Sequence, residues 1–112
     1  MKHKVVLVPF PFDDLSSAKV RPAVCLTEPI GQHRHVVLAF INSRVPDELL
    51  STDLVFSETE KDFSVTGLRV SSALQLHRMM TVATNIIVRE LGSLPTSAEK
   101  DVEGKLKLLF GI

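Results

Sequence analysis

The sequence is short of cysteine, of net charge and of long apolar runs. It holds one cysteine, Cys25, in 112 residues, so neither a disulfide within the chain nor a zinc site built from cysteines is expected. The formal net charge is zero, so nothing global indicates a nucleic-acid partner, and such a role needs a local basic patch. No apolar run approaches the roughly 18 residues of a membrane-spanning helix.

The beginning of the chain also lacks a signal for export. The apolar stretch before Pro9 is too short for the core of a signal peptide. Together with the near absence of cysteine, this favours a cytoplasmic protein.

Several common catalytic patterns are missing as well. There is no Gly-rich phosphate loop, no Gly-x-Ser-x-Gly elbow and no His-Glu-x-x-His pair. His33 and His35 lack a third metal ligand nearby, which favours a solvated strand end. Asp13 and Asp14 lie in a proline-rich loop, where adjacent acids are usually turn formers, and Cys25 is interpreted as a small buried hydrophobe. No metal or cofactor is expected.

The composition and the patterns along the sequence fit one small β-rich domain that spans residues 1–112. Hydrophobic residues make up 45% of the chain, which is ordinary for a globular protein. We expect a strongly bent β-barrel or half-open sheet with one terminal helix packed on it. The patterns of β-branched residues, alternation and turn residues predict strands over residues 4–8, 20–26, 35–42, 53–56, 69–82 and near 89–91.

Two local features refine this prediction. Pro22 cannot donate a ladder bond, so its strand should start at an edge or irregularly. Thr96-Ser97-Ala98-Glu99 has the pattern of a capping box, which predicts that the Thr96 side chain caps the terminal helix. Apolar residues then follow at helical spacing, and Gly111 ends the helix.

Arg21 is the first candidate functional residue. It begins a strand directly before Pro22, behind a loop that carries Ser16, Ser17 and Lys19. A guanidinium on a stiffened backbone beside hydroxyls and an ammonium suits phosphate recognition, and the alternative is an exposed arginine at a strand end.

Two further segments carry candidate residues. Asn42-Ser43-Arg44 ends the third strand, and His77-Arg78 adds a titratable group and a cation. Ends of strands are frequent positions for functional residues on a rigid scaffold. Phosphates bound in one groove would be neutralised by the cations Lys19, Arg21, Arg44 and Arg78.

Taken together, the sequence resembles the MazF/PemK family of toxin–antitoxin ribonucleases. The first stretch holds the opening strand, the loop and Arg21-Pro22, and the second runs Leu-Ala-Phe-Ile-Asn-Ser-Arg. The similarity spans almost the whole chain in order, through residues 5–24, 38–44, 66–78 and 88–94.

The resemblance implies a fold, an activity and partners. The fold is an SH3-like small β-barrel of the CcdB/MazF type with a C-terminal α-helix. The activity is that of a type II toxin: sequence-specific, metal-independent cleavage of single-stranded RNA to a 2′,3′-cyclic phosphate and a 5′-hydroxyl. The implied partners are a second copy of the chain and an antitoxin peptide over the RNA groove, with DNA engaged only through the antitoxin.

The resemblance also assigns roles to residues. Arg21 matches the family's catalytic arginine. Asn42 stands where the family usually has threonine or serine, so Asn42 is a candidate as a hydrogen-bond donor and the adjacent Ser43 as a hydroxyl. A shift by one residue along a strand turns a side chain to the other face, which favours Asn42. The expected RNA-binding residues are Ser16, Ser17, Lys19, Arg44, His77 and Arg78.

Two other functions remain open at this level. The last four residues, Leu-Phe-Gly-Ile, faintly resemble the ending of CcdB-like toxins, which inhibit DNA gyrase without being enzymes. Alternatively, Phe110 and Ile112 simply complete the packing of the helix. Asn42 also leaves open a catalytically weakened RNA-binding module of the same fold.

Overall fold

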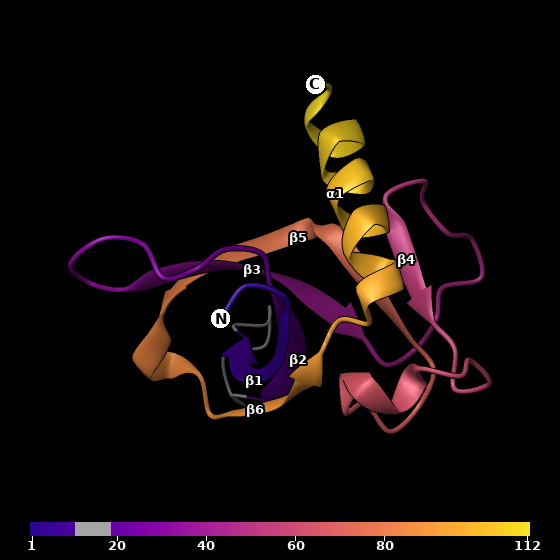
Figure 1. Ribbon diagram of the computed structural model, residues 1–112, viewed down its shortest axis with the longest axis horizontal. Helices are drawn as coiled ribbons and strands as arrows, with labels where there is room; N and C mark the ends of the chain where they lie inside the picture. Colours follow the sequence, from indigo (N-terminus) through magenta and orange to yellow (C-terminus); the bar gives the residue numbers. More distant parts are fainter. Residues whose placement is uncertain (11–18) are drawn as a thin grey trace.

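The computed structural model describes residues 1–10 and 19–112. Six strands precede one long helix (Figure 1), and two short 3-10 turns lie between strands at Phe63–Thr66 and Thr84–Ile86. The long elements are β1 (Lys4–Phe10), β2 (Lys19–Cys25), β3 (His35–Asn42), β4 (Asp53–Phe56), β5 (Ser72–Ala83), β6 (Arg89–Ser93) and α1 (Thr96–Phe110).

The six strands form one antiparallel sheet in the order β4-β5-β3-β2-β1-β6. The sheet curls into a half-barrel, and α1 packs at one end of it beside β4 and β5 (Figure 1). The predicted class, mainly β with a C-terminal helix, is confirmed, and the predicted strands are found within a few residues of their expected bounds.

Each face of the sheet carries its own apolar cluster, because side chains alternate along a strand. One cluster includes Ala39 and Ile41 of β3 and packs against Ala98 and Val102 of α1. Burying a side chain such as Val102 contributes about 1.5–3 kcal/mol, which holds the helix on the sheet. The other face of the sheet buries a second cluster that contains Val6, Val8, Ala23, Cys25, Val36, Leu38 and Phe40.

The longest strand, β5, is interrupted by a bulge. Along β3 the pairing passes from Ala39 opposite Met79 to Phe40 opposite Gln75, so residues 76–78 of β5 are inserted without partners on β3. Inserted residues bend a strand and change the direction of its side chains. The sequence predicted a continuous strand over 69–82, but residues 69–71 lie before β5 and the strand bends at the insertion.

The predicted capping box is wrong. Helix α1 starts at Thr96, after Pro95 as N-cap, and no side chain caps it. Since Thr96 is already helical, its hydroxyl does not take the capping position. Glu99 instead pairs with His3 of the N-terminal segment, with 3.6 Å between a carboxylate oxygen and the imidazole Nε2.

The other end of the helix agrees in part with the prediction. Gly111 ends α1 in the left-handed conformation, with φ of 69°, where glycine is favoured. Phe110 and Ile112, however, are 62% and 88% exposed. The interpretation that they complete the packing of the helix is therefore wrong.

Some sequence predictions fall on residues that the structure does not describe. Asp13, Asp14, Ser16 and Ser17 lie in the segment 11–18, outside the described residues. Among the described residues, no helix has the length and apolarity needed to cross a membrane.

Candidate functional site

A cavity of about 470 Å³ lies where β2 begins, β3 ends and β5 bulges. We call it the arginine cavity, because three of the six described residues that line it are arginines. No aspartate or glutamate of the described residues lines it. Its lining consists of Arg21, Phe40, Asn42, Ser43, Arg44 and Arg78.

The register of β2 and β3 explains why Arg21 and Asn42 meet here. The ladder pairs Ala23 with Phe40 and extends no further toward Pro22, which has no N–H for another ladder bond. Continuing the same register by two residues puts Arg21 opposite Asn42, on the sheet face of Ala23 and Phe40. As expected, β2 begins without a partner on one side: its residues before Ala23 pair with β1 but not with β3. The cavity begins where the ladder between β2 and β3 stops.

Arg78 reaches the cavity from the inserted residues of β5. Its guanidinium carbon lies 4.3 Å from the centroid of the Phe40 ring, a cation–π geometry. The ring therefore fixes the cation at the cavity wall. Phe40 was not a candidate in the sequence, because its contact with Arg78 depends on the bulge in β5.

The side chain of Asn42 is held by a hydrogen bond to the backbone of the turn that follows it. Its side-chain Oδ1 accepts a hydrogen bond of 2.9 Å from the backbone N–H of Arg44, as in an Asx turn. With the oxygen so engaged, the carboxamide retains its two N–H donors for another group. Ser43 is exposed at the rim. It follows the last residue of β3 and also lines the cavity.

The other predicted RNA-binding residues are not all in this cavity. Arg44 and Arg78 line it. Lys19 lies on β2 and His77 lies on β5. Both side chains are exposed, and neither lines the arginine cavity.

A second cavity, of about 370 Å³, adjoins the first and shares Ser43 with it. We call it the apolar cavity. Arg69 and Arg89 also line it, and neither was a candidate in the sequence, because only the curl of the sheet brings the segment before β5 to β6. Its apolar walls are Leu7, Pro22, Leu68, Val70 and Leu91.

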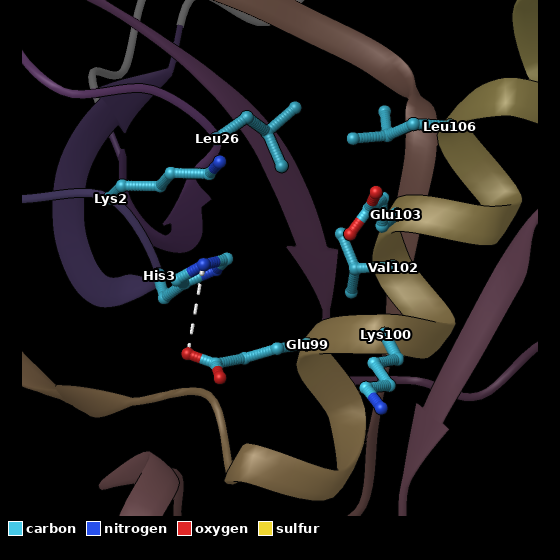
Figure 2. Close-up of a pocket in the computed structure, with 8 residues that line it drawn as sticks. All are labelled: Lys2, His3, Leu26, Glu99, Lys100, Val102, Glu103 and Leu106. Atoms are coloured by element: carbon cyan, nitrogen blue, oxygen red, sulfur yellow. Dashed lines mark ion pairs between the residues drawn. The ribbon is translucent and has the colours of Figure 1, made fainter.

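A third cavity, of about 260 Å³, lies between the N-terminal residues and α1. Figure 2 shows the His3 ring facing the Glu99 carboxylate across it. Lys2, Lys100 and Glu103 also line this cavity, so it carries both signs of charge. It differs in this from the arginine cavity, where each charged lining residue that the structure describes is a cation.

The remaining candidates have ordinary structural roles. Cys25 is fully buried, and this burial raises the pKa of its thiol to about 11, so the thiol stays protonated as expected for a buried hydrophobe. His33 and His35 are exposed, with ring centroids 5.9 Å apart. Within residues 1–10 and 19–112, no three His, Cys, Asp or Glu side chains gather as a metal site would require.

The comparison with family models identifies the family. Residues 2–110 match the model of the PemK-like, MazF-like toxins of type II toxin–antitoxin systems. The chain therefore belongs to this toxin family. Comparison with curated proteins gave no match.

Solved structures show the same fold at low sequence identity. The Mycobacterium tuberculosis toxin MazF-mt6 superposes with a TM-score of 0.74 at 20% identity, over 97% of both chains. A mycobacterial endoribonuclease in complex with its cognate antitoxin has a TM-score of 0.70 at 12% identity, over 100% of this chain and 95% of that one. A second M. tuberculosis toxin has a TM-score of 0.67 at 20% identity, over 94% and 98%.

Proposed function

We propose that this toxin is a metal-independent endoribonuclease that cleaves single-stranded RNA in the arginine cavity. The observation that carries the proposal is the meeting of Arg21, Arg44 and Arg78 around one cavity without an acidic lining residue among those described. Such a cavity attracts a phosphodiester and stabilises added negative charge on it. The family resemblance supports the same activity.

The proposed chemistry needs no external nucleophile. The 2′-hydroxyl of the RNA loses its proton and attacks the neighbouring phosphorus, and the bond from phosphorus to the 5′-oxygen breaks. The leaving oxygen takes up a proton, giving a 2′,3′-cyclic phosphate and a 5′-hydroxyl. Arg21 stabilises the charge of the phosphorane in between, and the Asn42 carboxamide donates to a phosphate oxygen.

The proposal includes the partners expected from the resemblance. A mycobacterial endoribonuclease of the same fold is known in complex with its cognate antitoxin, which supports an antitoxin that covers the RNA groove of this toxin. We also propose a homodimer that uses the outer end of α1, where exposed apolar residues would be covered. These residues are Leu108, Phe110 and Ile112. The RNA substrate implies a cytoplasmic location, with DNA contacted only through the antitoxin.

The first test concerns the metal and the products. We expect purified protein to cleave a defined single-stranded RNA equally well with EDTA and with added Mg²⁺, and the 5′-side fragment to carry a cyclic phosphate by mass spectrometry. A substrate with 2′-deoxyribose at the cut site should stay intact. Loss of cleavage in EDTA contradicts the mechanism, and intact RNA together with inhibited gyrase supercoiling would favour the CcdB-like alternative.

The second test separates Asn42 from Ser43. We expect Asn42→Ala to lower the single-turnover rate about tenfold, the effect of losing one neutral hydrogen bond. Ser43→Ala should keep most of the rate, because Ser43 is exposed at the rim of the cavity, beyond the end of β3, where water competes for its hydroxyl. Asn42→Thr should retain activity, since a threonine hydroxyl can donate and can also bond the nearby backbone. The opposite pattern for Asn42→Ala and Ser43→Ala would assign the role to the hydroxyl of Ser43.

A further inference from the structure

The position of the Arg78 guanidinium depends on more than its own backbone. Arg78 lies in the inserted segment 76–78 of β5, which has no ladder partners on β3. Leu76, at the start of this segment, is fully buried and anchors the backbone there, but the Arg78 side chain is exposed. A long, exposed side chain loses conformational entropy when it is held in one position. A further contact is therefore needed to keep its guanidinium at the cavity wall.

The ring of Phe40 supplies this contact. The guanidinium carbon of Arg78 lies 4.3 Å from the centroid of the ring. Within the described part of the chain, Arg78 takes part in none of the ion pairs. The cation–π contact is thus the interaction that ties this cation to the sheet.

The backbone of Phe40 is itself fixed from both sides. It belongs to β3, where it pairs with Ala23 of β2 and with Gln75 of β5. Its side chain is 5% exposed and belongs to the second apolar cluster, yet it also lines the arginine cavity. A ring held by two ladders and by a core can fix a cation that the inserted backbone alone leaves loose.

We propose that Phe40 is a positioning residue for RNA binding, whose ring holds the Arg78 guanidinium where it meets a phosphate of the substrate. This inference rests on the proposed function, because it takes the arginine cavity as the place of the phosphodiester. Phe40 acts through Arg78 and needs no contact of its own with the RNA.

An aromatic ring suits this task better than a carboxylate. A carboxylate beside Arg78 would engage its N–H donors and cancel the charge that attracts a phosphate. The face of a ring attracts the cation through its quadrupole and carries no net charge. The three arginines of the cavity thus keep their full positive charge while one of them is held in place. Holding it before the RNA arrives lowers the entropic cost of binding.

The test is a double-mutant cycle measured by equilibrium binding, which does not depend on cleavage. The probe is a single-stranded RNA decamer of mixed sequence, 2′-O-methylated so that it has no attacking hydroxyl. We expect Arg78→Ala to weaken binding about tenfold, as the loss of a charged hydrogen bond does. Phe40→Leu should weaken it about fivefold, the size of one cation–π contact. In a protein that already carries Arg78→Ala, Phe40→Leu should have no further effect.

Further variants exclude a merely structural role for Phe40. Phe40→Tyr keeps the ring face and should bind the decamer as the parent does. Leu38→Val is the matched control, because Leu38 belongs to the same apolar cluster, two residues earlier on β3, and lines neither the arginine nor the apolar cavity. It should lower the melting temperature and leave binding unchanged. Phe40→Met, whose flexible side chain fills irregular gaps, repeats the cycle if Phe40→Leu does not fold.

The outcomes separate this inference from the proposed activity. Equal losses from Phe40→Leu with and without Arg78, or unchanged binding by a folded Phe40→Leu variant, would overturn the inference and leave cleavage possible. The expected coupling in a protein that binds the decamer but cleaves no RNA would support the inference while the proposed activity fails. A parent protein that does not bind the decamer would overturn both.

Discussion

Replacing Arg21 with alanine is expected to lower the single-turnover rate of RNA cleavage by a hundredfold or more. Arg21 projects from the start of β2 into the arginine cavity, on the face shared with Asn42. Removing the main positive charge beside the phosphorane costs on the order of 3 kcal/mol, and about 1.4 kcal/mol corresponds to a factor of ten in rate. The measurement is the rate on one RNA with enzyme in excess.

Two variants serve as controls for this result. Arg21→Lys keeps the charge but loses the fork of donors, so it should retain more activity than Arg21→Ala. Arg34→Ala changes an exposed arginine in the connection between β2 and β3, away from the cavity lining, and should cleave normally. If Arg21→Ala cleaves as fast as the parent while its circular dichroism is unchanged, Arg21 has no part in the chemistry.

A large loss of stability is expected from a substitution at Gly92 of β6. An alanine Cβ there would overlap the carbonyl oxygen of Val65 and lie 2.6 Å from the carbonyl carbon of Thr66. Both contacts are backbone atoms, which cannot rotate away as a side chain can. We expect Gly92→Ala to lower the free energy of unfolding by about 3 kcal/mol, and the melting temperature by about 10 °C.

Gly104 provides the matched control. It lies exposed within α1, and an added Cβ would meet nothing within 4 Å. Alanine has the higher helix propensity, by about 0.8 kcal/mol, so Gly104→Ala should raise the melting temperature slightly. Calorimetry of both variants checks the pair. Similar shifts for the two would mean that β6 does not pack closely on the 65–67 segment.

Much of the fold could be predicted from local sequence, because strand and turn signals are local. The apolar run that ends at Asn42 and the position of Pro22 both led to the correct arrangement. The capping box failed because the buried residues before α1 fix where the helix begins. Sequence patterns cannot show how a preceding segment is anchored.

The candidate site was predictable only in part. Arg21 and Asn42 stand near the ends of strands that pair, so the register brings them together. Arg78 was a candidate, but its contact with Phe40 depends on the insertion in β5, which no local pattern signals. Arg69 and Arg89 lie 20 positions apart in the sequence, and only the curl of the sheet brings them to one cavity.

The bulge divides β5 into two segments that pair with different sets of strands. Residues 73–75 pair with both β4 and β3, and residues 79–83 pair with β3 alone. The inserted residues 76–78 have no pairing with β3 to preserve. Leu76 of this insertion is fully buried in the core, whereas His77 and Arg78 are exposed. Substitutions at positions 77 and 78 can therefore change the cavity wall without breaking the ladders on either side. Under the proposed function, such changes would alter the RNA that a toxin of this fold recognises while its sheet stays the same.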